Sequence, residues 1–119
     1  MPVIAFSIPI LADKTEAFRA AHRRLVVNRR TEFEVSRRRL GVTAERGFLQ
    51  RTPNGDLAVV VFDVIDPARM LAGMASSTEL LDADFRGYLL DVFGLDLTQA
   101  PTVQSELVFD WCAEESSRG

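Results

Sequence analysis

The sequence is poor in several residue types on which protein chemistry often depends. It contains one cysteine, one histidine, one tyrosine, one tryptophan and one lysine. The single Cys112 cannot form an intrachain disulfide, and one cysteine with one histidine provides no ligand cluster for a transition metal. No glycine-rich phosphate loop and no Gly-x-Ser-x-Gly turn occurs. These absences argue against disulfide-rich, zinc-finger and common nucleotide-binding classes, and we expect no cofactor and no metal.

Long apolar runs are also missing. The apolar stretch over residues 3–12 is interrupted by Ser7 and Pro9 and has no basic residue before it, so it is more typical of a strand than of a signal peptide. A chain of 119 residues with 47% apolar and 26% charged residues is long enough for one folded domain. We expect a cytoplasmic protein with no membrane partner.

Charge is distributed unevenly along the chain. Residues 1–51 contain 11 basic and 5 acidic residues, whereas residues 52–119 contain 3 basic and 12 acidic ones. A nucleic-acid surface normally gives a domain excess positive charge, and the net charge here is −3. We therefore expect no nucleic acid, and predict that Arg19, Arg23, Arg30 and Arg37 form a solvated flank that pairs with acidic residues.

The apolar patterns predict strands and helices in the order βαββαβ. The predicted strands cover residues 3–10, 42–52, 57–65 and 103–112. The predicted helices cover residues 14–40, which could hold a kink at residues 28–31, and, with a break at 76–79, residues 67–93. This order predicts an α+β, ferredoxin-like fold with a four-stranded antiparallel sheet and both helical regions on one face. We expect a single domain over residues 1–112 and a flexible tail over residues 113–119.

Local signals set the boundaries of these elements. Asp13 is the expected N-cap of the first helix, and Gly41 its stop. Asn54-Gly55 predicts a hairpin turn, because both residues tolerate positive φ. Asp66-Pro67 is typical of a helix start, and Gly94 of a helix end.

The predicted strand over residues 57–65 has apolar residues on both faces. Leu57, Val59 and Val61 alternate with residues that are equally apolar, and Asp63 is the one charge. Helices cover one face of such a sheet, so the other face needs a second cover. We predict a homodimer through the sheet face; the alternative is that the tail or long neighbouring side chains shield it.

This element order, the doubly apolar strand ending in Asp-Pro and the final ELVFDW run resemble the dimeric α+β barrel superfamily. That group includes polyketide cyclases, cofactor-free antibiotic-biosynthesis monooxygenases, muconolactone isomerase and haem-degrading enzymes. The Phe18–His22 stretch and Trp111 are closest to the cyclases, and LGVTAERGFLQ is similar to a bacterial branch to which we assign no activity. Where the cyclases have arginines early in the second strand, this chain has Thr43, Ala44 and Glu45, so a cyclase site is not transferred.

Polar residues lie on the apolar stripe of the predicted first helix. An uninterrupted helix places His22, Arg29 and Ser36 on the same face as Phe18. Polar groups on an inward face need partners or water, so these residues could line a cavity between helix and sheet. The resembled superfamily often binds its ligands there.

Three residues are candidates for catalysis. His22 could act as a general base, and Arg29 could stabilise an anionic oxygen. Glu45 could orient a group or assist proton transfer, while Phe18, Ser36 and Asp63 are candidates for ligand contacts.

Each candidate also has a structural interpretation. His22 could be an inert hydrogen-bonded histidine, and Arg29 could pair with Glu32, Glu45 or Asp63. Either carboxylate on the hairpin could pair with an arginine across the sheet or face solvent.

Two hypotheses about function follow from these observations. The first is a dimeric module that binds a small organic molecule without catalysis. The second is a cofactor-independent cyclase, isomerase or monooxygenase-like enzyme that acts on an aromatic or polyketide-type compound.

Overall fold

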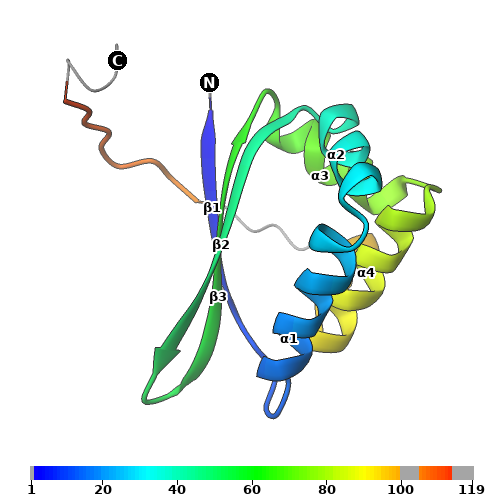
Figure 1. Cartoon of the computed structure of the whole chain (residues 1–119). Coiled ribbons are helices and arrows are strands. Elements are labelled where there is room, and N and C mark those ends of the chain that lie inside the picture. Colours follow the sequence, from blue (N-terminus) through cyan, green and yellow to red (C-terminus); the bar gives the residue numbers. More distant parts are fainter. Residues whose placement is uncertain (1, 100–104, 114–119) are drawn as a thin grey trace.

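The computed structural model describes residues 2–99 and 105–113, which form an α+β fold (Figure 1). Its regular elements follow in chain order: β1 (Val3–Pro9), α1 (Thr15–His22), the π-helical turn η1 (Arg23–Val27), α2 (Arg30–Arg39), β2 (Val42–Thr52), β3 (Gly55–Val64), α3 (Pro67–Ser76), α4 (Leu80–Phe93) and the 3₁₀ turn η2 (Leu97–Gln99). The α+β class predicted from the sequence is confirmed.

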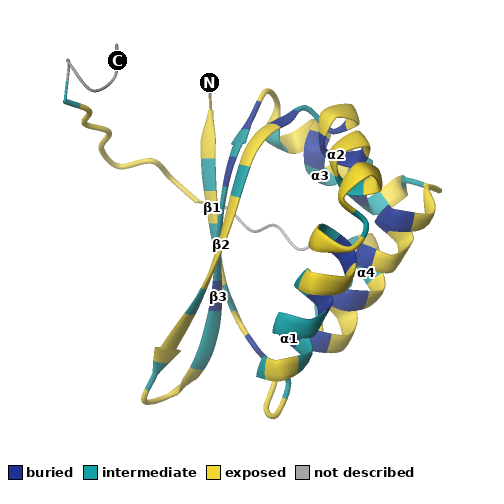
Figure 2. Cartoon of the chain, in the orientation of Figure 1, coloured by how far each residue is buried: buried dark blue, intermediate teal, exposed yellow. Residues whose placement is uncertain are grey.

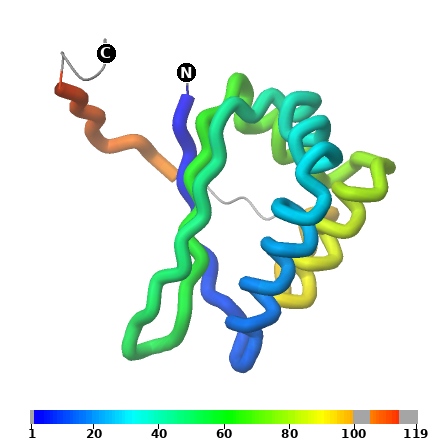
Figure 3. Tube along the Cα trace, viewed as in Figure 1, coloured from blue at the N-terminus to red at the C-terminus, as the bar shows by residue number. Residues whose placement is uncertain are grey.

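The strands form an antiparallel sheet in the order β1-β3-β2. β3 is therefore central, which explains why it carries almost no charge. The helices cover one face of this sheet, and segment 105–113 leaves on the opposite side (Figure 1). The turn end of the β2–β3 hairpin extends away from the helices (Figure 3).

The core lies between the sheet and the helices (Figure 2). Ala58 and Phe62 of β3 point toward the helices, where they meet apolar side chains of α1, α3 and α4. One buried cluster gathers around Leu25 and Phe85, and the other around Val64 and Met70. The helical layer therefore packs on alternate residues of β3, as the strand pattern predicts.

Several local predictions are confirmed. The predicted β2–β3 hairpin forms, but its two turn residues are Pro53 and Asn54 rather than Asn54-Gly55, because Thr52 and Gly55 already pair. Gly55 follows the turn with a φ of 126°. Asp66 caps α3 by accepting a hydrogen bond from the Arg69 backbone N–H (3.2 Å). Gly94 adopts the left-handed conformation, with Leu95 N donating to Leu89 O, so α4 ends in a Schellman motif.

One uninterrupted helix over residues 14–40 is not formed, and the non-helical residue of the break lies within residues 28–31, where a kink is the alternative. The π-helical turn η1 and a non-helical Arg29 (φ −118°, ψ 45°) divide this range into α1 and α2. Asp13 is not the N-cap either, because it has a φ of 65° and Lys14 takes that position without a side-chain cap bond. Absence of Gly and Pro did not keep the helix regular.

The predicted last strand is also corrected over its described part. Residues 105–112 pair with no strand of the described chain, and residues 103–104 lie outside the described ranges. One hydrogen bond ties this segment to the free edge of β1, from the Ala5 backbone N–H to Ser105 Oγ (3.1 Å). The described chain therefore has a three-stranded sheet rather than four strands. The predicted flexible tail falls outside the described residues, apart from Ala113.

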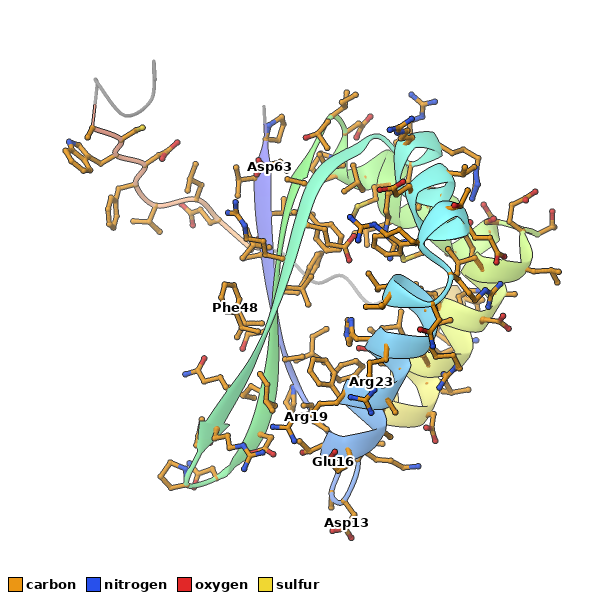
Figure 4. All side chains as sticks on the ribbon, viewed as in Figure 1. Asp13, Glu16, Arg19, Arg23, Phe48 and Asp63 are labelled. Carbon is orange, nitrogen blue, oxygen red and sulfur yellow. The ribbon has the colours of Figure 1, made fainter. Side chains whose placement is uncertain are left out.

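The face of the sheet away from the helices is largely apolar. Phe48 projects from it and is 54% exposed (Figure 4). Val59 lies opposite Phe48 in the register, and Val61 and Val3 lie on the same face. This is the second apolar face of the sheet, for which the sequence predicts a cover other than the helices. Among the described residues, no helix is long and apolar enough to cross a membrane.

Candidate functional site

A cavity of about 370 Å³ lies between the sheet and the helices. Most of its wall is apolar and comes from both layers, including Phe6 and Val60 from the sheet and Met74 and Leu89 from the helices. Cavities of this size and polarity are typical of small-molecule sites. The polar groups on its wall therefore decide what it can do.

Six polar side chains line the cavity; Arg30 and Glu34 are exposed, and we call the four buried or half-buried ones the cavity cluster. They are His22, Arg37, Glu45 and Tyr88. They come from four different elements (α1, α2, β2 and α4), so the packing of the helices on the sheet brings them together.

Arg37 is the central member of the cavity cluster. It is only 5% exposed, and its guanidinium carbon lies 4.5 Å from the ring centre of Phe33 and 4.4 Å from that of Phe85. Its Nε donates to Glu45 Oε1 (2.8 Å), and its Nη1 donates to Ser36 Oγ (3.2 Å). Stacking and ion pairing together hold the guanidinium in one orientation.

The third nitrogen of this guanidinium is different. Nη2 of Arg37 is buried and has no hydrogen-bond partner within the described part of the chain. A buried donor without an acceptor costs about 1–3 kcal/mol. Proteins accept this cost mainly where another molecule completes the bonding.

His22 and Tyr88 form the second polar contact of the cavity cluster. Their Nε2 and hydroxyl oxygen lie 3.0 Å apart, and the histidine tautomer decides which of them donates. The two rings meet edge to face at 5.5 Å. This contact presents a fixed imidazole and phenol to the cavity.

Burial sets the protonation of this pair. Desolvation lowers the pKa of His22 below its ordinary value, although nearby Glu45 raises it and Arg37 lowers it further. Desolvation and Glu45 together raise the pKa of Tyr88. Both side chains are therefore uncharged at neutral pH, and His22 is a neutral base.

The break between α1 and α2, made by the π-helical turn and the non-helical Arg29, decides which residues of α2 reach the cavity. A π turn holds one residue more than an α turn, so later positions shift by about 100° around the axis. Arg30 and Arg37 consequently line the cavity, where an uninterrupted helix would place Arg29 and Ser36. The prediction that Arg37 belongs to a solvated flank is wrong.

Arg29 lies outside the cavity. It donates to Glu32 (2.8 Å) and to Asp84 (2.5 Å), and these hydrogen bonds raise its pKa. Its ion pair with Glu32 matches the structural interpretation. The structure does not bring Arg29 to His22 and Glu45.

Ser36 is buried but faces α4 rather than the cavity. Its hydroxyl donates to Asp82, which also accepts a hydrogen bond from Arg39. Burial alone would raise the pKa of Asp82, but bonds from Ser36, Ser77 and Arg39 outweigh it and hold the pKa below its usual value. We call Ser36, Arg39 and Asp82 the closed cluster.

The two remaining candidates also lie away from the cavity. Phe18 is a core residue whose ring packs edge to face on His22 at 4.8 Å. Asp63 lies on the sheet face away from the helices, where Thr43 and Val3 are its neighbours. Phe18 therefore supports the position of His22, and Asp63 belongs to the other surface.

Sequence reasoning missed Arg37 and Tyr88 as site residues. The signal for Tyr88 was present, since a single tyrosine on the buried stripe of α4 needs a polar partner for its hydroxyl. Arg37 had no comparable signal, because its inward position depends on the π turn.

No group of three or more His, Cys, Asp and Glu side chains in residues 2–99 and 105–113 is placed to hold a metal ion. The four side chains of the cavity cluster can take part in hydrogen bonding and proton transfer. Comparison with family models, curated proteins and solved structures finds no match to this chain.

Proposed function

We propose that this protein binds a small, mainly apolar organic molecule in the cavity between its sheet and its helices. The observation that carries the proposal is that Arg37, whose buried Nη2 has no partner among the described residues, lies on the wall of an apolar space of about 370 Å³. A folded chain gains nothing from an unfilled apolar space next to an unsatisfied donor. A bound molecule would remove both costs.

Filling the cavity tests this proposal. A Cβ at Gly47, on the wall of the cavity, would meet no heavy atom within 4 Å, so Gly47→Leu fills space without removing a contact. We expect 2-acetonaphthone, a compact neutral aromatic ketone, to bind the native protein and to lose at least about tenfold in affinity for Gly47→Leu, measured by calorimetry.

Gly87→Leu is the matched control. A Cβ there also meets nothing within 4 Å, but Gly87 is exposed on α4 and does not line the cavity. Equal affinity of the ketone for both leucine variants would contradict binding in the cavity.

The His22–Tyr88 contact favours a second candidate, a cofactor-independent cyclase, isomerase or monooxygenase-like enzyme. A neutral His22 can take a proton from carbon next to a carbonyl, while the electron pair moves to the carbonyl oxygen beside Arg37. We would measure exchange of the acetyl methyl protons of 2-acetonaphthone in D₂O. Faster exchange with native protein than with His22→Gln supports the enzyme, and equal rates favour binding alone.

We also propose that two copies pair through the sheet face, as the resemblance to the dimeric α+β barrel superfamily implies. Apolar Val3 and Phe48 on this face are exposed, and so are Leu107, Phe109 and Trp111 on the segment that leaves the edge of β1. Large exposed apolar surfaces mark interfaces.

Charge also favours this pairing. Arg46 lies on the same face as Phe48, and it complements the acidic Glu106 and Asp110 of that segment.

In this dimer, residues 105–112 would supply the fourth strand of the ferredoxin-like order. β1 is an edge strand with unpaired backbone groups, and the segment is already bonded to it at Ala5. We expect light scattering to show a dimer at micromolar concentration, and a monomer for Phe48→Glu. Leu90→Glu changes an equally exposed leucine on α4 and should stay dimeric. A native monomer would contradict the proposal.

A further inference from the structure

The charges around the cavity are balanced. Its titratable lining residues comprise two ion pairs and two uncharged groups: Arg37 with Glu45, Arg30 with Glu34, and His22 with Tyr88. The Arg37–Glu45 pair lies deep, with the carboxylate side chain 16% exposed, whereas both members of the Arg30–Glu34 pair are exposed. A ligand that brings its own charge would therefore find no free counter-charge.

The Arg37 guanidinium nevertheless has one nitrogen, Nη2, without a hydrogen-bond partner among the described residues. Its Nε donates a hydrogen bond to Glu45, and its Nη1 donates one to Ser36. Phe33 and Phe85 also contact the guanidinium, and because their ring centres lie only 6.2 Å apart they cover adjoining sides of it rather than opposite faces. A further partner has to approach from a side that these rings leave open. Such a partner must be an acceptor, because arginine has only donors.

We infer that the ligand is an uncharged molecule whose carbonyl or hydroxyl oxygen accepts a hydrogen bond from Nη2 of Arg37, with its apolar body on the wall formed by both layers. This inference rests on the proposed cavity function. It adds which residue anchors the ligand, which kind of atom it anchors and what charge the ligand carries. An anion is disfavoured because Glu45 already neutralises Arg37, and burying a second carboxylate leaves one of them without a counter-charge.

Three probes of similar shape separate these features. They are 2-acetonaphthone, with a neutral acceptor; 2-isopropylnaphthalene, with the same outline and no acceptor; and 2-naphthoate, with a charged acceptor. A hydrogen bond to a charged donor is worth about 1.5–3 kcal/mol, or roughly tenfold to a hundredfold in affinity. We expect the ketone to bind at least about tenfold more tightly than either of the others.

The Glu45→Gln variant removes the negative charge that neutralises Arg37 and changes the shape of the side chain little. Its amide oxygen can still accept from Nε, so Arg37 stays in place while its charge is no longer neutralised. We expect the affinity of 2-naphthoate, relative to that of 2-acetonaphthone, to rise about tenfold in this variant. Circular dichroism checks that the variant folds, and the comparison of the three probes on the native protein does not depend on it.

The outcomes are distinct. If 2-isopropylnaphthalene binds the native protein as tightly as the ketone, Arg37 is satisfied by water and the inference fails, while the cavity function stands. If 2-naphthoate binds the native protein most tightly, the ligand is an anion and the inference also fails. If none of the three binds, the cavity function and the inference fall together.

Discussion

Two polar clusters lie on neighbouring residues of α2, and they are built in opposite ways. In the closed cluster, the fully buried Asp82 accepts from Ser36 and Arg39. In the cavity cluster, Arg37 lies on the wall of the cavity and its Nη2 has no acceptor among the described residues. A polar group whose bonds are all made within the chain holds the fold together, whereas a group left incomplete beside a cavity is available to a ligand.

Breaking the closed cluster should have the largest effect on stability. Asp82→Ala leaves the Ser36 hydroxyl and Arg39 without their shared acceptor, and we expect a loss of about 2–3 kcal/mol in the free energy of unfolding. Urea unfolding at pH 7 measures it. A loss no larger than that of an exposed alanine substitution would show that this cluster does not stabilise the fold.

The same carboxylate should make stability depend on acid pH. The pKa of Asp82 is lowered in the folded chain, so its contribution is complete above the ordinary aspartate value near 4 and is lost as pH falls through the lowered pKa. Asp82→Asn should show a flatter decline of stability below about pH 4. Parallel curves for the two proteins would contradict the assignment.

Replacing the cavity pair should cost far less. The double variant Arg37→Met, Glu45→Gln removes a buried ion pair and keeps similar volumes, and such exchanges are often neutral within about 1 kcal/mol. We expect urea unfolding close to that of the native protein, together with loss of the preference for 2-acetonaphthone over 2-isopropylnaphthalene. A loss as large as that of Asp82→Ala would make the two clusters alike and remove the basis for the comparison.

The protonation of His22 gives a smaller but cleaner effect. It is the only histidine, so one imidazole resonance in NMR reports its titration. Burial should place its pKa below 6.5, and Glu45→Gln should lower that pKa further, because Glu45 raises it. Because the folded-state pKa is lowered, the stability due to neutral His22 is complete above about pH 6.5 and declines below it. A pKa above 6.5 would contradict a buried, neutral base.

The smallest effect is expected at Arg29. Its partners Glu32 and Asp84 are both more than half exposed, so solvent screens these pairs. We expect Arg29→Ala to leave the affinity for 2-acetonaphthone unchanged and to alter the melting temperature least among these variants. A loss of affinity like that of Gly47→Leu would assign Arg29 to the site after all.

Much of the fold follows from local sequence signals. Asn54-Gly55, Asp66-Pro67 and Gly94 act through the conformations of one or two residues, so the hairpin and both helix boundaries could be predicted. The conformation of residues 105–112 could not be predicted in this way, because pairing of that segment depends on the edge strand β1, which lies far away in the sequence.

The site was predictable in part for the same reason. His22 precedes the π turn, so helical periodicity places it toward the cavity. Strand alternation does not say which of Glu45 and Asp63 faces the helices, and β2 has a register shift just before Glu45. Arg29 and Arg37 follow the turn. A helix without interruption would place Arg29 toward the cavity and Arg37 on the outer flank, which is the reverse of the observed arrangement. The partner of Ser36 on α4 is fixed by tertiary packing, which no local pattern contains.

The π turn at Arg23–Val27 has a consequence for how this site can arise or disappear. We expect deletion of one residue there to rotate α2 relative to α1 by about 100° and carry Arg37 away from the cavity, although every side chain of the cavity cluster would still be encoded. The site thus depends on chain length within one turn as much as on residue identity. Two related chains that differ by this single residue could share their cavity-forming sequence and bind different molecules.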